Sequence, residues 1–308
     1  MDRLTFRFLG LEDVVKAGAL DMKRAVEDIE NVLSLHDKGD YVLPGKIVLR
    51  WGEAENEYTT GRINGMPGYI GGAYAMAGIK WIGSNPENPF KFQLPRASAL
   101  TILNDPETKL PLACMDGTVI SAMRTGAATG VAARYLSRED SAVLGLIGAG
   151  VQNRTQLKAV LAVRPAISEV FVYDIDRERA EKFAAETSKS ENVNVVPAST
   201  PEECTRNADI IITATVATEP IVQKEWIREG CMFANISGYE YTFDALRTAD
   251  KIVTDNLKQI VHRRHSTLAL MILEGLLSED DVYSSLGMIV NGKKTAGKTR
   301  KSGFISTR

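Results

Sequence analysis

Short apolar runs alternate with amphipathic stretches between about residue 140 and residue 256. The apolar runs are rich in valine and isoleucine, and the stretches between them are long enough for helices. This alternation predicts parallel strands joined by helices that cover both faces of one sheet. The sequence therefore predicts an α/β fold with a Rossmann-type doubly wound parallel sheet. The predicted strands are Val143–Ile147, Val170–Tyr173, Val193–Val196, Ile210–Thr213, Met232–Ile236 and Ile252–Thr254.

The stretches between and after these strands predict helices. Asp176–Ser188 has a helical pattern, and Thr200 can cap a helix that continues with a proline and two glutamates. After residue 256 the pattern predicts helices up to about Val290. The basic cluster within Lys293–Lys301 is predicted to lie in a solvated loop.

Residues 1–120 have a different pattern, which predicts a separate α+β domain. An amphipathic helix is expected at Asp21–His36. A long helix at Met115–Tyr135 is expected to lead into the nucleotide-binding domain. The expected β-type segments are Lys46–Arg50, Ala73–Trp81 and Ala97–Asn104.

These patterns predict two domains. Residues 1–120 would bind substrate and mediate dimerisation, residues 121–280 would form the Rossmann domain, and residues 280–308 would join the first domain. The β-type segments of the first domain are few and short, so an exposed sheet edge is expected to pair with a second copy. We therefore expect a homodimer.

The first strand of the α/β region ends in a glycine turn. Gly148-Ala149-Gly150 precedes a helical stretch, and the next strand ends in Asp174. This order of strand, glycine turn, helix, strand and acid is typical of a dinucleotide site. Gly148 would permit the tight turn, Gly150 would allow a pyrophosphate to approach, and Asp174 would bind the ribose hydroxyls. Because a carboxylate repels a 2′-phosphate, NAD(H) is expected in preference to NADP(H).

One residue departs from the glycine pattern. Asn153 occupies the third glycine position, so the helix is expected to lie less close to the strand. The residues expected to border the nucleotide come from this turn, from the hydroxyl-rich end of Ile210–Thr213 and from neighbouring segments. They are Arg96, Arg124, Thr125, Gly148, Ala149, Gly150, Val151, Gln152, Asn153, Asp174, Ile175, Thr213, Ala214, Thr215 and Ile236.

Composition excludes several classes of protein. The net charge of −2 argues against a general nucleic-acid binder, and 44% hydrophobic residues are enough for two cores. No apolar run approaches the ~20 residues that span a bilayer, and the N-terminus lacks a signal-peptide pattern. The cysteines and histidines have no metal-ligand spacing. We expect a cytoplasmic protein with reduced cysteines and no metal, nucleic-acid or membrane partner.

Several segments together resemble the ornithine cyclodeaminase/mu-crystallin family. They include MPGYIGG at 66–72, AGIKWIGSNPENP at 77–89, LNDPETKLPLACMDGTVISAMRTGAATG at 103–130, GAGVQNRTQ at 148–156 and LGMIVNG at 286–292. The resemblance covers nearly the whole chain and implies a nicotinamide-dependent fold more firmly than one substrate. It also implies that relatives continue past Arg308 into a glycine-rich turn and a helix. Whether this chain is a shortened member or a piece of a longer one stays open.

The resemblance implies a set of substrate-site residues. Lys80 and Arg124 would hold the substrate carboxylate, with Lys46 as a third cation and Arg50 as its alternative. Glu240 occupies the position of a catalytic aspartate in the family, and Glu240 and Lys80 are the expected catalytic residues. Asp244 and Glu219 are the alternatives to Glu240. Arg96 replaces a small hydroxyl residue of family members and could reach a phosphate or a second acidic group of the substrate.

Two functions from different classes follow. The first is an NAD(P)-dependent oxidoreductase or cyclodeaminase that acts on a small L-amino acid or its imine. The second is a nucleotide-bound ligand-binding or accessory subunit with little turnover, as the resemblance to mu-crystallin implies. Retention of Lys80 and Arg124 with a carboxylate at 240 favours the enzyme, whereas the change from Asp to Glu and the neighbouring Tyr239 favour the alternative.

Overall fold

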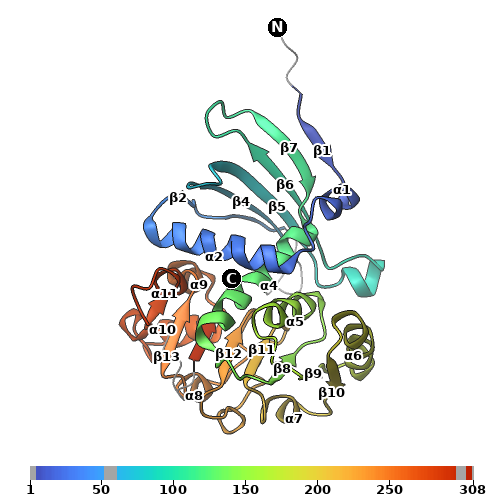
Figure 1. Ribbon diagram of the computed structural model, residues 1–308, viewed down its shortest axis with the longest axis vertical. Helices are drawn as coiled ribbons and strands as arrows, with labels where there is room; N and C mark the ends of the chain where they lie inside the picture. The colour runs from blue at the N-terminus through green and yellow to red at the C-terminus, as the bar shows by residue number, and fades with distance from the viewer. Residues whose placement is uncertain (1–4, 52–60, 296–302, 307–308) are drawn as a thin grey trace. The chain divides into compact units, whose positions relative to one another are not determined.

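The computed structural model describes residues 5–51, 61–295 and 303–306 (Figure 1). The chain divides into two compact units. The first unit comprises Met1–Asp21 and Lys38–Met123, and the second comprises Met22–Asp37 and Arg124–Arg308. Most of the basic segment within Lys293–Lys301 lies outside the described residues.

The second unit contains a sheet of eight strands among the described residues, all of them parallel. Their order is β10-β9-β8-β11-β12-β15-β13-β14. From β8 to β10 successive strands are added on one side of β8, and from β11 onward they are added on its other side. This arrangement confirms the predicted doubly wound α/β fold. The strands are β8 (Val143–Ile147), β9 (Glu169–Tyr173), β10 (Asn194–Pro197), β11 (Ile210–Thr213), β12 (Met232–Asn235), β13 (Lys251–Thr254), β14 (Ser284–Ser285) and β15 (Gly303–Ser306).

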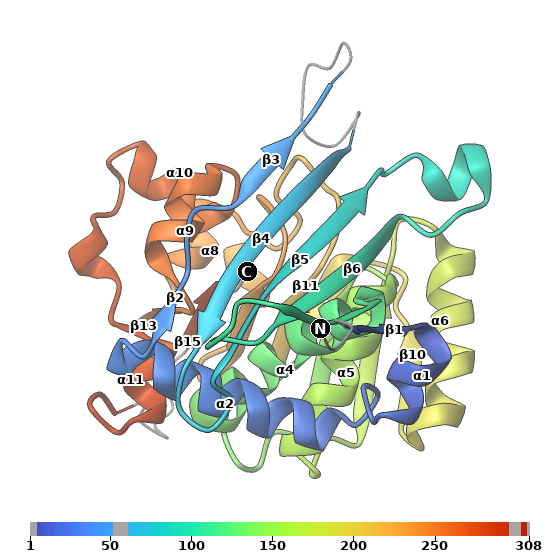
Figure 2. The ribbon, with the colours of Figure 1, turned by 90° about the horizontal axis from the view of Figure 1, so that it is seen from above.

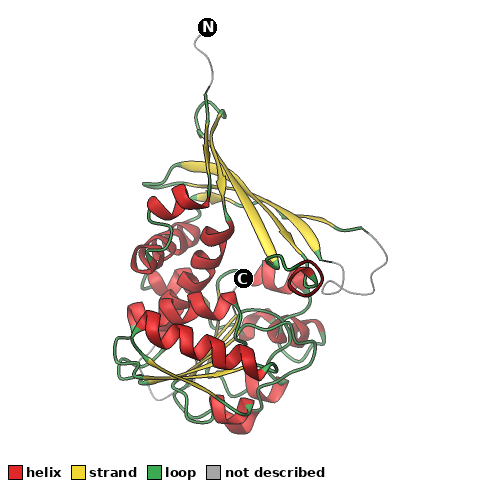
Figure 3. Cartoon of the chain, turned by 90° about the vertical axis from the view of Figure 1, so that its right-hand side faces the viewer, coloured by secondary structure: helices red, strands yellow, loops and turns green. Residues whose placement is uncertain are grey.

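Helices pack around this sheet (Figure 3). The predicted cap of α7 is confirmed, because the Thr200 hydroxyl accepts a 3.0 Å hydrogen bond from the Glu203 amide. The helices are α2 (Met22–Lys38), α4 (Thr118–Leu136), α5 (Val151–Val163), α6 (Arg177–Glu191), α7 (Pro201–Thr205), α8 (Phe243–Leu246), α9 (Leu257–Arg263), α10 (Thr267–Leu273) and α11 (Leu286–Val290), with 3-10 turns at Lys224–Trp226 and Glu279–Asp281.

Strand β15 lies in the middle of the parallel sheet, between β12 and β13. Phe304 and Ile305 are fully buried there, and the Phe304 ring contacts the ring of Phe233 at 5.1 Å between centroids. The sequence pattern did not predict this strand, because four residues carry almost no periodic signal. Its pairing with strands about 50 and 70 residues earlier in the chain is a tertiary effect.

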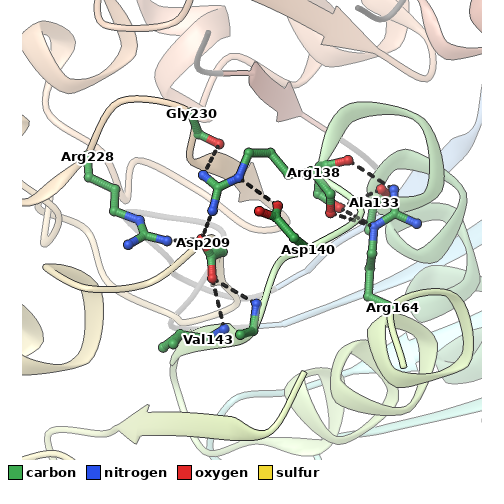
Figure 4. Close-up of polar contacts among 10 residues, drawn as sticks. Ala133, Arg138, Asp140, Val143, Arg164, Asp209, Arg228 and Gly230 are labelled. Atoms are coloured by element: carbon green, nitrogen blue, oxygen red, sulfur yellow. Dashed lines mark hydrogen bonds and ion pairs between the residues drawn. The ribbon is translucent and has the colours of Figure 1, made fainter. Parts of the chain in front are cut away.

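A buried carboxylate organises the amino-terminal ends of β8 and β11 (Figure 4). Asp209 directly precedes β11, and its carboxylate accepts hydrogen bonds from the amides of Ala142 at 2.8 Å and Val143 at 3.0 Å. Arg138 and Arg228 form ion pairs with the same carboxylate. Because its charge is paired and its oxygens accept hydrogen bonds, Asp209 can stay buried at this end of the sheet.

The first unit contains a mixed sheet of seven strands among the described residues, in the order β1-β7-β6-β5-β4-β2 with β3 also paired to β4. Figure 2 shows β3, β4, β5 and β6 side by side. The sequence pattern did not predict β1, β2, β4 or β7, and the prediction of a helix from Met115 is wrong at its start, because Met115 and Asp116 end β7. The strands are β1 (Arg7–Leu9), β2 (Tyr41–Val42), β3 (Ile47–Leu49), β4 (Arg62–Ile70), β5 (Met76–Ser84), β6 (Ala97–Asn104) and β7 (Pro111–Asp116), with α1 (Leu11–Lys16) and a π-helical turn at Asn88–Phe92.

This sheet is larger than the sequence pattern predicted. Strands β4 and β5 pair along nine residues each, so the first unit forms an extended sheet within one chain. The first unit therefore does not need a second copy to complete its sheet. The strands were missed because Gly65, Gly68 and Pro67 interrupt the apolar alternation of β4.

Candidate nucleotide and substrate site

The glycine turn follows β8, at the switch point of the parallel sheet. Gly148 has φ +99°, a backbone conformation that residues with a side chain rarely adopt. A Cβ atom at this position would lie 2.7 Å from the carbonyl oxygen of Ala214, which follows β11. The turn and the end of β11 are therefore in close contact, and only glycine fits between them.

Asn153 connects α5 to the end of β8 through side-chain hydrogen bonds. Its side chain is fully buried, and Nδ2 donates hydrogen bonds to the carbonyl oxygens of Ile147 at 2.8 Å and Gly148 at 2.6 Å. Where the fingerprint usually has a glycine, an amide group occupies the space between helix and strand and satisfies two strand-end carbonyls. The asparagine thus supports the turn by hydrogen bonding.

Asp174 lies beside the turn at the end of β9. One carboxylate oxygen accepts a 2.8 Å hydrogen bond from the Ala149 amide, and the other accepts a 3.0 Å bond from the Asp176 amide. The next residue, Ile175, is 94% exposed. An acid beside the turn fits an adenosine ribose, and the exposed apolar side chain next to it fits an adenine ring.

The space beside the turn fits a dinucleotide. A Cβ atom at Gly150 would meet no atom within 4 Å among the described residues, so the backbone is open there to a pyrophosphate. Gly150 also forms the N-cap of α5, whose first amides point toward the same opening. The neighbouring Val151 exposes its apolar side chain. The residues present therefore fit the adenosine diphosphate part of a nicotinamide dinucleotide.

Glu240 is fully buried at the carboxyl ends of β11 and β12. Its Oε1 accepts hydrogen bonds from the amide of Thr215 at 2.6 Å and from the hydroxyl of the same residue at 2.7 Å. Its Oε2 accepts bonds from the Thr213 hydroxyl at 2.7 Å, Asn235 Nδ2 at 2.7 Å and the Ser237 amide at 3.3 Å. Both oxygens are thus surrounded by donors from the protein itself.

Two opposing effects act on this carboxyl group. Burial raises the pKa of Glu240 above its ordinary value, because the charged form loses its hydration. The hydrogen bonds from Thr213, Thr215 and Ser237 act in the opposite direction, since they stabilise the carboxylate. The assignment of proton transfer to Glu240 remains a prediction. Of the alternatives, Asp244 pairs with Arg247 and Glu219 is exposed.

In the first unit, Lys80 lies on β5 opposite Met66 of β4. Its Nζ donates a 3.2 Å hydrogen bond to the hydroxyl of Ser121 on α4. Lys46 directly precedes Ile47, which pairs with Gly65, so the continued register brings Lys46 opposite Met66 as well. Residues opposite one another in antiparallel strands share a face. The two lysines therefore lie on the same face of the sheet, on either side of β4.

The remaining predicted residues lie in several places. Arg96 is exposed just before β6, and its carbonyl oxygen accepts a 2.9 Å bond from the Asn85 amide. Arg124 and Thr125 lie in α4, and burial lowers the pKa of Arg124, with Asp255 opposing and Arg263 reinforcing this shift. Ile236 follows β12 and donates its amide to the Thr213 carbonyl at 3.1 Å.

Sequence reasoning missed two contacts of the site. Asn235 ends β12, and its Nδ2 donates both to Glu240 and to the Gly238 carbonyl at 3.0 Å. Ser121 provides the oxygen that Lys80 contacts. The sequence offered one signal for the contact of Asn235, because this polar residue ends the buried strand Met232–Asn235. The second depends on tertiary packing alone.

The described residues contain neither a cluster of metal-ligating side chains nor a membrane-spanning helix. No group of three or more His, Cys, Asp or Glu side chains there could hold a metal ion. In the same part of the chain, no helix has the length and apolarity to cross a membrane.

Comparison with known proteins identifies relatives of this chain. The sequence model of the ornithine cyclodeaminase/mu-crystallin family matches residues 11–304. N-((2S)-2-amino-2-carboxyethyl)-L-glutamate dehydrogenase of Staphylococcus aureus is 35% identical over 286 residues, which are 92% of this chain and 84% of the relative.

Solved structures match over nearly the whole chain. The Δ1-pyrroline-2-carboxylate reductase of Thermococcus litoralis, in complex with NADH and L-proline, superposes with a TM-score of 0.89 at 35% identity, covering 98% of this chain and 92% of that chain. An archaeal alanine dehydrogenase dimer with bound NAD superposes with a TM-score of 0.86 at 32% identity, covering 98% and 90%.

Proposed function

Because the chain belongs to the ornithine cyclodeaminase/mu-crystallin family, we propose a specific reaction within the activity of that family. The protein is an NAD(P)-dependent dehydrogenase or reductase acting on amino acids or imines. We propose that it exchanges a hydride between a nicotinamide and the α-carbon of a small L-amino acid or its imine, with net oxidation or reduction. The redox-neutral cyclodeamination of ornithine is then a different reaction.

The burial of Glu240 carries this proposal. Cyclodeamination needs a group that moves protons during several steps at the substrate, and the sequence resemblance assigns that part to position 240. Here both carboxylate oxygens accept hydrogen bonds from the protein. Hydride transfer to a protonated imine has a simpler requirement, since the carbon accepts the hydride and the nitrogen already carries its proton. The similar proteins named as dehydrogenases and a reductase support the same reaction.

The bound nicotinamide would accept or donate the hydride, and the chain would hold the substrate. We propose that Lys80 binds the α-carboxylate, because a cation on the face of β5 is fixed by the sheet register and by Ser121. Lys46, on the same face across β4, is proposed as a second cation. Arg124 is proposed as the third. A carboxylate fixed in this way positions the α-carbon for hydride transfer.

An assay that follows nicotinamide absorbance and ammonia release together tests the reaction. We expect a change in absorbance that persists at the end of turnover, with at least one small L-amino acid or cyclic imine. Ammonia released from ornithine without lasting change in absorbance would instead establish cyclodeamination. Tight nucleotide binding without turnover on any amino acid or imine would favour the ligand-binding alternative.

We propose a homodimer, because one face of the first unit's sheet exposes large apolar side chains. Ile47 and Trp81 flank Gly65 in the register, and Trp81 pairs with Leu100 on the next strand. Trp81 is 41% exposed, and Ile47, Leu100 and, further along the sheet, Phe8 are also exposed. Such a continuous apolar face is typical of an obligate interface. The dimeric state of the similar archaeal alanine dehydrogenase supports this assembly.

A cytoplasmic location is also proposed. Cys204 and Cys231 are buried free thiols, and burial raises the pKa of each to about 12. Protonated, inaccessible thiols are compatible with a reducing compartment. Labelled antibody or fractionation of the source cells would test this location.

A further inference from the structure

We infer that Glu240 is a positioning residue that holds the nucleotide crevice in shape, and that it does not carry protons to or from the substrate. This inference rests on the binding of a nicotinamide dinucleotide at the glycine turn. Glu240 lies at the carboxyl ends of β11 and β12, next to the switch point between β8 and β11 where the crevice of a doubly wound sheet lies. Its role follows from what its carboxylate contacts on each side.

The carboxylate ties two adjacent strand ends together. On the β11 side it accepts bonds from Thr213 and from both the amide and the hydroxyl of Thr215. On the β12 side it accepts bonds from Asn235 and Ser237. A charged acceptor with this many donors gives a rigid network, because charge-assisted hydrogen bonds are the stronger kind. Thr213 is fully buried, and its hydroxyl lies 2.7 Å from Glu240 Oε2 and 3.3 Å from the Ala234 carbonyl oxygen.

The backbone around Glu240 is fixed as firmly as its side chain. The Glu240 carbonyl oxygen accepts hydrogen bonds from the amides of Ile221 at 2.8 Å and Val222 at 3.0 Å. Tyr241 is fully buried, and its hydroxyl donates to the Ala234 carbonyl at 3.2 Å. The carboxylate is therefore presented from a rigid base in the core, as a supporting residue of a binding site must be.

Contacts continue from the carboxylate to the glycine turn. Ala214 lies between the two threonines that Glu240 binds, and its amide donates to the Ile147 carbonyl at 3.0 Å. The Ala214 carbonyl oxygen is the atom that leaves room only for glycine at position 148. A shift of Thr213–Thr215 would therefore move the wall against which the turn is packed. Loss of the Glu240 network is expected to distort the turn that binds the pyrophosphate.

Glutamine at this position tests the inference without changing the size of the side chain. An amide nitrogen must replace either Oε1, which faces two donors, or Oε2, which faces three among the described residues. In both orientations N–H groups would point at one another, so the network opens. A positioning role and a proton-transfer role then give different results in binding and in turnover.

The experiment measures the Kd of NADH by fluorescence, and kcat at saturating NADH, for Glu240→Gln and for a matched control. The control is Asp209→Asn, which removes a buried carboxylate next to the opposite, amino-terminal end of β11. Both variants are expected to unfold at lower temperature. We expect the Kd of NADH to rise about tenfold or more in Glu240→Gln and to stay within about twofold of the parent in Asp209→Asn.

The effect on kcat distinguishes a positioning role of Glu240 from a proton-transfer role. We expect kcat at saturating NADH to fall by less than about tenfold in Glu240→Gln, whereas loss of a general acid or base lowers it by about 10²–10⁴-fold. An unchanged Kd with a large loss of kcat would overturn the inference. An equal rise of Kd in Asp209→Asn would also overturn it, since the effect would then be loss of stability. The Kd measurement needs no turnover, so it stands apart from the identity of the substrate.

Thr213→Val provides a second variant if Glu240→Gln does not fold. It removes one buried donor to Glu240 and retains the shape of the side chain. We expect a smaller rise in the Kd of NADH, of about threefold to tenfold. Wild-type affinity in a folded Thr213→Val protein would contradict the proposed connection between the carboxylate and the crevice.

Discussion

The main-chain amide of Ala149, in the glycine turn, donates a 2.8 Å hydrogen bond to the carboxylate of Asp174 at the end of the neighbouring strand. This bond fixes the acid against the turn that follows β8, although the two residues are 25 positions apart. The Asp176 amide holds the other carboxylate oxygen. The acid proposed to select the ribose and the turn proposed to bind the pyrophosphate are therefore held together.

The first prediction concerns the choice of nucleotide. We expect NADH to bind more tightly than NADPH, because the Asp174 carboxylate repels a 2′-phosphate. The nearby arginines do not offset this, since Arg177 pairs with Glu181 and Arg179 pairs with Asp176. Asp174→Ala should reduce the ratio of the Kd of NADPH to the Kd of NADH by about tenfold or more.

Fluorescence titration of both reduced nucleotides measures this ratio. Glu178→Ala is the matched control, because it removes another acid of the first turn of α6 and leaves Asp174 and both arginine pairs in place. The control should keep the parent ratio. Tighter binding of NADPH than of NADH by the unaltered protein would contradict the prediction.

The second prediction concerns the substrate carboxylate. Lys80→Met keeps most of the apolar stem of the side chain and removes the cation on the face of β5. We expect the KM for the amino acid or imine to rise about a hundredfold, with the Kd of NADH unchanged. Lys46→Met should have a smaller effect, because Lys46 precedes its strand and is less fixed.

Steady-state kinetics at saturating nucleotide measure the effect. Lys91→Met is the control, since Lys91 is an exposed lysine of the same unit that pairs with Glu87. Equal turnover of an amino acid and of the corresponding amine without a carboxylate would show that these cations have another role.

The third prediction concerns assembly. Trp81→Glu introduces a charge into the exposed apolar face of the mixed sheet, and burial of an unpaired charge at an interface is unfavourable. We expect a dimer for the unaltered protein at micromolar concentration and a monomer for Trp81→Glu, both measured by light scattering. Leu273→Glu is the control, since Leu273 is an exposed apolar residue of the second unit, at the end of α10. A monomeric unaltered protein would refute the assembly.

The fourth prediction concerns stability and pH. Hydrogen bonds from Lys293 at 2.8 Å and from Asn291 at 2.6 Å lower the pKa of Asp37, at the end of α2. A carboxyl group with a lowered pKa stabilises the fold above its unfolded pKa, near 3.9, and loses that contribution as the pH falls through its folded pKa. We expect Asp37→Asn to lower the free energy of unfolding by about 1–2 kcal/mol at pH 7.

Urea unfolding at several pH values tests this linkage. The difference between the parent and Asp37→Asn should begin to shrink near pH 4, where the unfolded chain binds a proton at Asp37, and should be lost below the lower pKa of the folded chain. Asp28→Asn is the control, because Asp28 lies on the same helix in an exposed pair with Arg24. A difference that stays constant down to pH 2 would refute the assignment to Asp37.

The sequence predicted the parallel sheet well and the mixed sheet poorly. Val143–Ile147 and Ile210–Thr213 have the predicted bounds, because buried parallel strands are short continuous apolar runs between polar stretches. Strand β4 was missed, since its glycines and proline weaken the alternation that marks an exposed antiparallel strand. The family predicted from the motifs is confirmed by the match over residues 11–304.

The sequence by itself determined the dinucleotide turn, because all its parts lie within Leu146–Asp174 and follow from local backbone geometry. Only the tertiary structure decided the environment of Glu240. Its donors come from two strands and the segments that follow them, and a pattern of residue types along the chain does not record which side chains meet. The same holds for β15, whose place in the sheet depends on pairing with β12 and β13 far away in the sequence. The periodicity of apolar residues indicates local secondary structure, whereas burial and the saturation of hydrogen bonds arise only when distant segments pack together.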